Sequence, residues 1–206
     1  MSKEIKFNED QLDCFCELIN ISYGTATASI SDMLNSFATL KVPKIKILPS
    51  SELKTYLLDR VNKNDEQFVA TQHLVGDILG ENLFLIDKSS AINLAKGFEI
   101  ENNEINNDDV ISDIVLEVIN ILSSTALRKL SEELRLTVFV EPPIIEKIDS
   151  ITNLDNSFLE EYQQIIIISS SIEFKEQNIE ASFMLLTKDE SILLIQSSIN
   201  KILEKL

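Results

Sequence analysis

The sequence predicts an α+β fold built from two copies of one αβ(α)ββα unit. The copies share an antiparallel sheet, and their two long exposed helices are related by a pseudo-two-fold axis. Three observations predict it: the chain repeats itself at an offset of 100 residues, each copy opens with a long uninterrupted helical stretch, and strand-like segments follow in pairs separated by short polar turns. Because no Gly-, Pro- or Ser-rich linker separates the copies, we expect one fused domain over residues 1–206, with repeats at about 8–103 and 106–206.

The repeat is clearest where residues 10–43 are laid over residues 110–143 without a gap. Ten positions then carry the same residue type. In the first copy these are Asp13, Glu17, Ile19, Asn20, Ile21, Thr25, Ala26, Ser31, Leu34 and Pro43.

Each copy begins with a predicted helix of about seven turns that no proline interrupts. The first runs to about residue 35 and starts at Asn8 as N-cap, with Gln11 placed to complete a capping box and Phe7 placed to pack against Leu12. The second starts within residues 105–110 and runs to about residue 135.

The strands come next in each copy. Residues 40–47 alternate in polarity and residues 136–140 are rich in β-branched side chains, so each long helix leads into one strand. Pro43 places the first of these at a sheet edge or a strand end. We expect short helical or irregular connections at 50–58 and 151–162. Antiparallel hairpins follow at 67–78 with 82–87 and at 164–174 with 179–187, and helices near 89–98 and 188–206 close the two halves.

Composition excludes several classes of function. Eighteen Lys and Arg against 34 Asp and Glu give a formal charge of −16, which opposes binding to nucleic acid and to anionic membranes. The amino terminus has no apolar signal-peptide core, and the longest aliphatic run, 165–168, is far shorter than the ~20 residues of a membrane span. We therefore expect a cytoplasmic protein.

Catalytic chemistry based on His or Cys has few residues to draw on. Cys14 and Cys16 are the only cysteines and His73 is the only histidine, too few soft ligands for a zinc site. Two cysteines two positions apart lie on roughly opposite sides of a helix and cannot form a disulfide there. We interpret His73 as a structural strand residue.

A polar stripe on each long helix is the candidate site. Asp13, Glu17 and Asn20 fall within about 60° of arc on a helix, opposite Phe15 and Ile19. Such a stripe is also what a merely solvated helix face shows. The identical triad at Asp113, Glu117 and Asn120 favours a function, because exposed positions without a task should have diverged as Ala28 and Arg128 have.

The pattern Asp or Ser, three residues, Glu, two residues, Asn, twenty-two residues, Pro resembles that of the CheC/CheX/FliY phosphatases of bacterial chemotaxis. This sequence matches it twice, at Asp13, Glu17, Asn20 and Pro43, and at Asp113, Glu117, Asn120 and Pro143. Two intact motifs favour the two-site CheC form, and we expect none of the flagellar switch domain into which FliY-like proteins continue. After the Asn the family often has Ile-Gly-x-Gly. This sequence instead has Ile-Ser-Tyr-Gly at 21–24 and Ile-Leu-Ser-Ser at 121–124.

The resemblance implies hydrolysis of the aspartyl phosphate on a CheY-type response regulator. It implies that Glu17 or Glu117 forms a salt bridge to a lysine of the regulator, and that Asn20 or Asn120 orients the attacking water. No cofactor of the chain's own is expected, because the bound regulator supplies Mg²⁺. The deamidase CheD is a further candidate partner.

Two other classes of function remain open at this stage. One is a non-catalytic CheC-like module that binds a response regulator or another chemotaxis or flagellar protein, as FliM resembles this fold without the phosphatase residues. The other is an acidic scaffold whose match to the motif is accidental.

Overall fold

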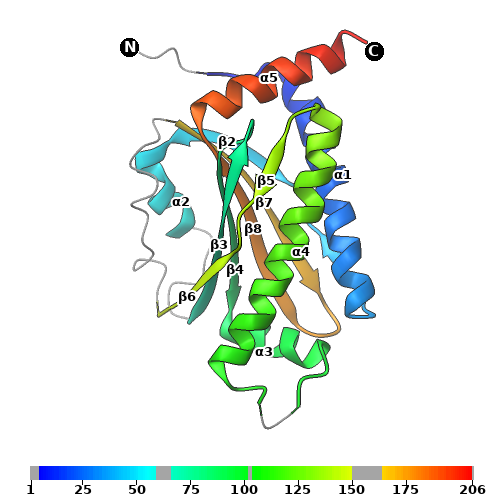
Figure 1. The fold of residues 1–206 in the computed structure, drawn as a ribbon, viewed down its shortest axis with the longest axis vertical. Helices are drawn as coiled ribbons and strands as arrows, with labels where there is room; N and C mark the ends of the chain where they lie inside the picture. Colours follow the sequence, from blue (N-terminus) through cyan, green and yellow to red (C-terminus); the bar gives the residue numbers. More distant parts are fainter. Residues whose placement is uncertain (1–4, 59–65, 102–103, 150–163, 206) are drawn as a thin grey trace.

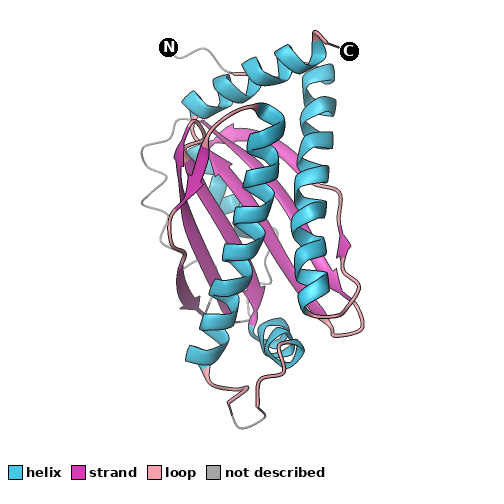
Figure 2. Ribbon diagram, turned by 45° about the vertical axis from the view of Figure 1, so that its right-hand side comes forward, coloured by secondary structure: helices cyan, strands magenta, loops and turns pink. Residues whose placement is uncertain are grey.

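The structure, a computed structural model, describes residues 5–58, 66–101, 104–149 and 164–205. It is an α+β fold in which helices cover a curled, eight-stranded antiparallel sheet (Figures 1 and 2). The helices are α1 (Glu9–Met33), η1 (Ser50–Glu52), α2 (Leu53–Leu58), α3 (Lys88–Gly97), α4 (Asp108–Leu134) and α5 (Asp189–Leu203). The strands are β1 (Thr39–Leu40), β2 (Lys44–Pro49), β3 (Gln67–Gly76), β4 (Gly80–Asp87), β5 (Val138–Val140), β6 (Ile144–Ile148), β7 (Gln164–Phe174) and β8 (Ile179–Thr187).

The start of α1 confirms the predicted capping box. The Asn8 side chain accepts a hydrogen bond from the Gln11 backbone N–H at 2.8 Å, and the Gln11 side chain accepts one from the Asn8 N–H at 2.9 Å. The Phe7 ring stacks on Phe15 with centroids 5.9 Å apart, and its predicted contact with Leu12 stays a prediction.

Each expected single strand after the long helices proved to be two strands, so the predicted αβ(α)ββα unit was one strand short. Pro43 separates β1 from β2, and Pro143 separates β5 from β6, which the sequence analysis missed. Proline offers no N–H to the ladder, so the chain leaves strand geometry there and resumes pairing afterwards. The connection expected at 151–162 lies outside the described residues.

The two halves exchange strands within one sheet. β1 and β2 of the first half pair with β7 of the second, and β5 and β6 of the second pair with β3 of the first. At the centre β4 pairs with β8, with Leu83 opposite Met184 and Phe84 opposite Phe183. Moving each residue to its counterpart 100 positions away turns one of these pairs into the other, as a two-fold axis between the copies would require.

The long helices α1 and α4 lie side by side on one face of this sheet and run in opposite directions (Figure 1). One buried core fills the space between them and the sheet, and it includes Phe15, Ile19, Val115 and Ile119. A smaller apolar cluster lies on the opposite face, where α2 contributes Leu53 and Leu57. The main core thus lies on the face of the sheet that the two predicted site helices cover.

Helix α4 is long and apolar enough, by length and composition, to cross a membrane, contrary to the expectation from aliphatic runs alone. Half of its most apolar 18-residue window is buried inside the protein, however, with mean hydropathy 1.7. The packing against α1 and the sheet accounts for this apolar character, as in the core helix of a globular protein.

Candidate functional site

The predicted site residues of the first copy lie on the outer face of α1. Asp13, Glu17 and Asn20 are exposed, whereas Phe15 and Ile19 behind them are fully buried. The helix therefore turns its apolar face to the sheet and its polar stripe to solvent. Because Glu17 and Asn20 are three residues apart, their side chains are neighbours on this surface.

The second copy repeats this arrangement on α4. Asp113, Glu117 and Asn120 are exposed, and Val115 and Ile119 are fully buried. The sequence of buried, half-buried and exposed positions over residues 111–120 is the same, position by position, as over residues 11–20. The two polar stripes thus stand on equivalent backgrounds in one outer layer of helices (Figure 2).

The four stripe carboxylates are available to a partner. Among the described residues, no Lys, Arg or His lies within ion-pair distance of Asp13, Glu17, Asp113 or Glu117, and no hydrogen bond engages their side chains. Nearby, burial raises the pKa of the Cys16 thiol, and the Asp13 carboxylate raises it further; burial raises the pKa of Cys14 as well. Both thiols are therefore poor nucleophiles at neutral pH.

The two motif prolines mark breaks in the edge strands. Pro43 is buried between β1 and β2, and Pro143 is half-buried between β5 and β6. The backbone just before each proline is held by a side chain from a hairpin strand: the Ser170 hydroxyl donates to the Lys41 carbonyl at 2.6 Å, and the Gln72 amide donates to the Glu141 carbonyl at 2.8 Å. The proline region is thus fixed to the sheet in both halves.

The asparagines differ in their surroundings. The Asn120 side-chain oxygen accepts a hydrogen bond from Nε2 of Gln72 at 3.3 Å. Within the described residues the Asn20 side chain makes no hydrogen bond. Gln72 was not among the predicted site residues, although it is a polar side chain in a buried strand.

His73 lies on β3 as expected and serves a structural purpose. Its Nδ1 contacts the buried carboxylate of Glu81 on the paired strand β4. Burial raises the pKa of Glu81, while the imidazole opposes that effect. In the part of the chain that the structure describes, no group of three or more His, Cys, Asp or Glu side chains could hold a metal ion.

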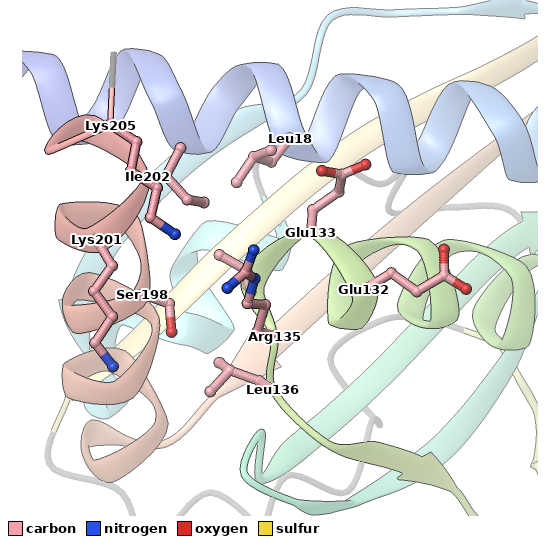
Figure 3. A pocket seen from close by; sticks show the side chains of 10 residues that line it. Leu18, Glu132, Glu133, Arg135, Leu136, Ser198, Lys201, Ile202 and Lys205 are labelled. Atoms are coloured by element: carbon pink, nitrogen blue, oxygen red, sulfur yellow. The ribbon is translucent and has the colours of Figure 1, made fainter.

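A cavity of about 540 Å³ lies between the end of α4, helix α5 and Leu18 of α1 (Figure 3). Its walls combine apolar and charged side chains, and none of the predicted site residues lines it. The charged residues are Glu132, Glu133, Arg135, Lys201 and Lys205.

The fold and the twice-repeated motif resemble those of the CheC-type chemotaxis phosphatases. The chain is 21% identical over 181 residues to the flagellar motor switch phosphatase FliY of Bacillus subtilis (strain 168), an alignment that covers 86% of this chain and 46% of that protein. The chain thus spans about half the length of this curated relative. No protein-family model matches the sequence.

Solved structures show the same fold. FliY of Thermotoga maritima superposes with a TM-score of 0.75 at 18% identity, over 96% of this chain and 99% of that one. CheX of Desulfovibrio desulfuricans gives 0.54 at 18% identity, over 82% and 99%. The middle domain of FliM from H. pylori gives 0.55 at 15% identity, over 93% and 99%. These similarities confirm the resemblance inferred from the motif, and they show that flagellar FliM proteins share the fold.

Proposed function

We propose that the protein is a phosphatase that hydrolyses the aspartyl phosphate of a CheY-type response regulator, with one site on each long helix. The observation that carries the proposal is the exposed Glu–Asn pair, present at Glu17 and Asn20 and again at Glu117 and Asn120. The similarity to a FliY phosphatase supports it. The similarity of the chain to CheC-like chemotaxis proteins holds whether or not it hydrolyses this phosphate.

The proposed reaction requires few catalytic groups from this chain. An acyl phosphate already carries a carboxylate leaving group, and the regulator holds Mg²⁺ against the phosphoryl oxygens, so the remaining task is to place a water in line. A carboxamide suits the task because it offers a donor and an acceptor and does not titrate. The glutamate, without an ion-pair partner in the described residues, would bind a lysine of the regulator and bring the asparagine to the phosphoryl group.

The partners follow from the same relatives. Because these relatives are chemotaxis and flagellar proteins, we expect partners from that machinery, with phosphorylated regulator as substrate. Binding of CheD and a cytoplasmic location are further proposals. The charge of −16 still argues against nucleic acid.

The test is a dephosphorylation assay. A CheY-type regulator from the same genome is charged with acetyl phosphate and Mg²⁺, desalted, and mixed with a substoichiometric amount of the protein while phosphate release is followed. We expect multiple turnovers, with the double variant Asn20→Ala/Asn120→Ala as the inactive control. Phosphate loss at the regulator's own rate would contradict the proposal.

A non-catalytic binding module is the second candidate, and the shared fold of the FliM middle domain favours it. The same assay separates the two when binding is measured alongside. A protein that binds phosphorylated regulator and leaves its phosphate intact would be such a module.

A further inference from the structure

Strand β3 carries one polar residue in an otherwise apolar row. Phe68, Ala70 and Leu74 point into the core beneath the long helices, and Gln72 lies between Ala70 and Leu74 in the same row with 1% of its surface exposed. Its Nε2 donates to the Glu141 carbonyl at 2.8 Å and to the Asn120 side-chain oxygen at 3.3 Å. One buried amide group therefore joins the proline region of the second half to the asparagine of the second stripe.

The proline region of the first half is held by a shorter residue, which comes from β7 of the second half. On β7 the row is Ile166, Ile168, Ser170 and Ile172, and the Ser170 hydroxyl donates to the Lys41 carbonyl at 2.6 Å. Lys41 and Glu141 are 100 positions apart and precede Pro43 and Pro143 by two residues. Ser170 thus makes the contact that holds the proline region, but only the longer Gln72 also reaches the asparagine.

The Gln72 side chain also carries an energetic cost. Its Oε1 is buried and has no hydrogen-bond partner among the described residues. Burying an unsatisfied amide oxygen is unfavourable, and a serine at this position would avoid it while still reaching a carbonyl. Packing therefore does not explain the choice of glutamine over serine.

Resting on the proposed function, we infer that Gln72 is a positioning residue of the second site. The hydrogen bond occupies one lone pair of the Asn120 oxygen and limits rotation of the exposed carboxamide, leaving the Nδ2 donors and the second lone pair to face the water and the phosphoryl group. Asn20 must be ordered by the substrate itself. The second site therefore reaches its reactive geometry more often once regulator is bound, which raises kcat rather than affinity.

The experiment isolates the second site in the Asn20→Ala protein and adds Gln72→Ser, which copies the serine found at Ser170, or Gln72→Leu, which keeps a side chain of similar size. We expect both to lower kcat about fivefold, the scale of freeing one side chain, with KM for phosphorylated regulator unchanged. The matched control is Ser170→Ala in the same background, which should leave second-site kcat unaltered. Thermal unfolding of every variant identifies losses that come from folding, and a result from either Gln72 variant is sufficient if the other does not fold.

Each outcome decides one question. Unchanged kcat in a folded Gln72 variant would overturn the inference while leaving the proposed function intact. A higher KM with the same kcat would also overturn it, because Gln72 would then shape the docking surface instead. If Asn20→Ala is active but adding Asn120→Ala changes nothing, the proposed function of Asn120 fails, and the role of Gln72 fails with it.

Discussion

The first turns of α1 and α4 occupy equivalent places in the fold but are anchored by different kinds of side-chain contact. At α1 the contacts are neutral amides: Gln11 donates to Asn200 of α5 at 2.7 Å and accepts from Gln196 at 3.2 Å. At α4 they are ionic, since Asp108 lies 2.6 Å from Lys147 and 3.2 Å from Lys88. Glu66 completes this network with both lysines.

The difference shows which features of the two helices have been kept alike. Their ends are anchored by unrelated groups, and their core residues differ, as Phe15 and Val115 do. The outward stripe of Asp, Glu and Asn is identical in both. Folding alone can be satisfied by several anchors, so the identity of the stripe is better explained by a common partner.

The largest expected effect tests whether the stripes are equivalent in function. Asn20→Ala with Asn120→Ala should abolish turnover, whereas each single variant should retain activity and the losses should add, because sites that share no residue usually act independently. Stability should change by no more than about 0.5 kcal/mol, since both side chains are exposed. Phosphate release and urea unfolding measure the two. A single variant as inactive as the double one would mean that the sites are coupled or that only one works.

The second prediction concerns the inward faces. Phe15→Ala should lower the free energy of unfolding by about 3–5 kcal/mol, because it leaves a large cavity and removes the ring stacked on Phe7. Val115→Ala at the equivalent, equally buried position should cost clearly less, since fewer atoms are removed. Urea unfolding of both proteins checks the order. Equal costs would show that the two positions are not packed alike.

A smaller effect is expected from the stripe glutamates. Glu17→Gln with Glu117→Gln should weaken binding of phosphorylated regulator about two- to fivefold, the scale of a surface ion pair, and should flatten the salt dependence of association. Surface plasmon resonance at low and high salt measures this. Binding of the variant that equals wild type at low salt would rule out the proposed salt bridge.

The smallest effect distinguishes the two helix starts by pH. Lys147 and then Lys88 hold the pKa of Asp108 below its ordinary value. Its stabilising contribution is therefore present above the unfolded-state pKa and is lost as pH falls through the lowered folded value. Lowering the pH should reduce the amide hydrogen-exchange protection factors, corrected for the intrinsic exchange rate at each pH, in the first turn of α4, and reduce them less in the first turn of α1, whose anchoring amides do not titrate. An equal reduction in both first turns would contradict this.

Much of the fold could be predicted because its signals are local. Helix α1 ends two residues before the expected position, and β7 and β8 begin and end where predicted, since caps, alternation and turns lie within each segment. The separation of β1 from β2 and the existence of β6 were missed. Their pairing partners lie in the other half of the chain, and short strands beside proline carry a weak local pattern.

In the candidate site, too, the residues with a local sequence signal were predicted and the residue that depends on long-range pairing was missed. Helical periodicity was sufficient to place Asp13, Glu17 and Asn20 outward, because that inference needs only one helix. Gln72 was missed because its contacts depend on the register of β3 with strands of the other half. In the sequence alone it is a polar residue next to His73, as on any half-exposed strand. Only the pairing of β3 with β5 and β6 brings it to α4. A polar residue breaking a buried row was the available signal.

The exchange of strands between the halves has a consequence for the protein during its synthesis. β2 ends at Pro49, but its partner β7 starts at Gln164, and at about 5–20 residues per second the ribosome needs roughly 6–23 s to cross that interval. During this time the alternating segment Lys44–Pro49 is an unpaired edge. Lys44 and Lys46 at exposed positions on it would discourage pairing with other nascent chains. These two lysines can thus be understood as protecting β2 from intermolecular pairing until β7 has been synthesised.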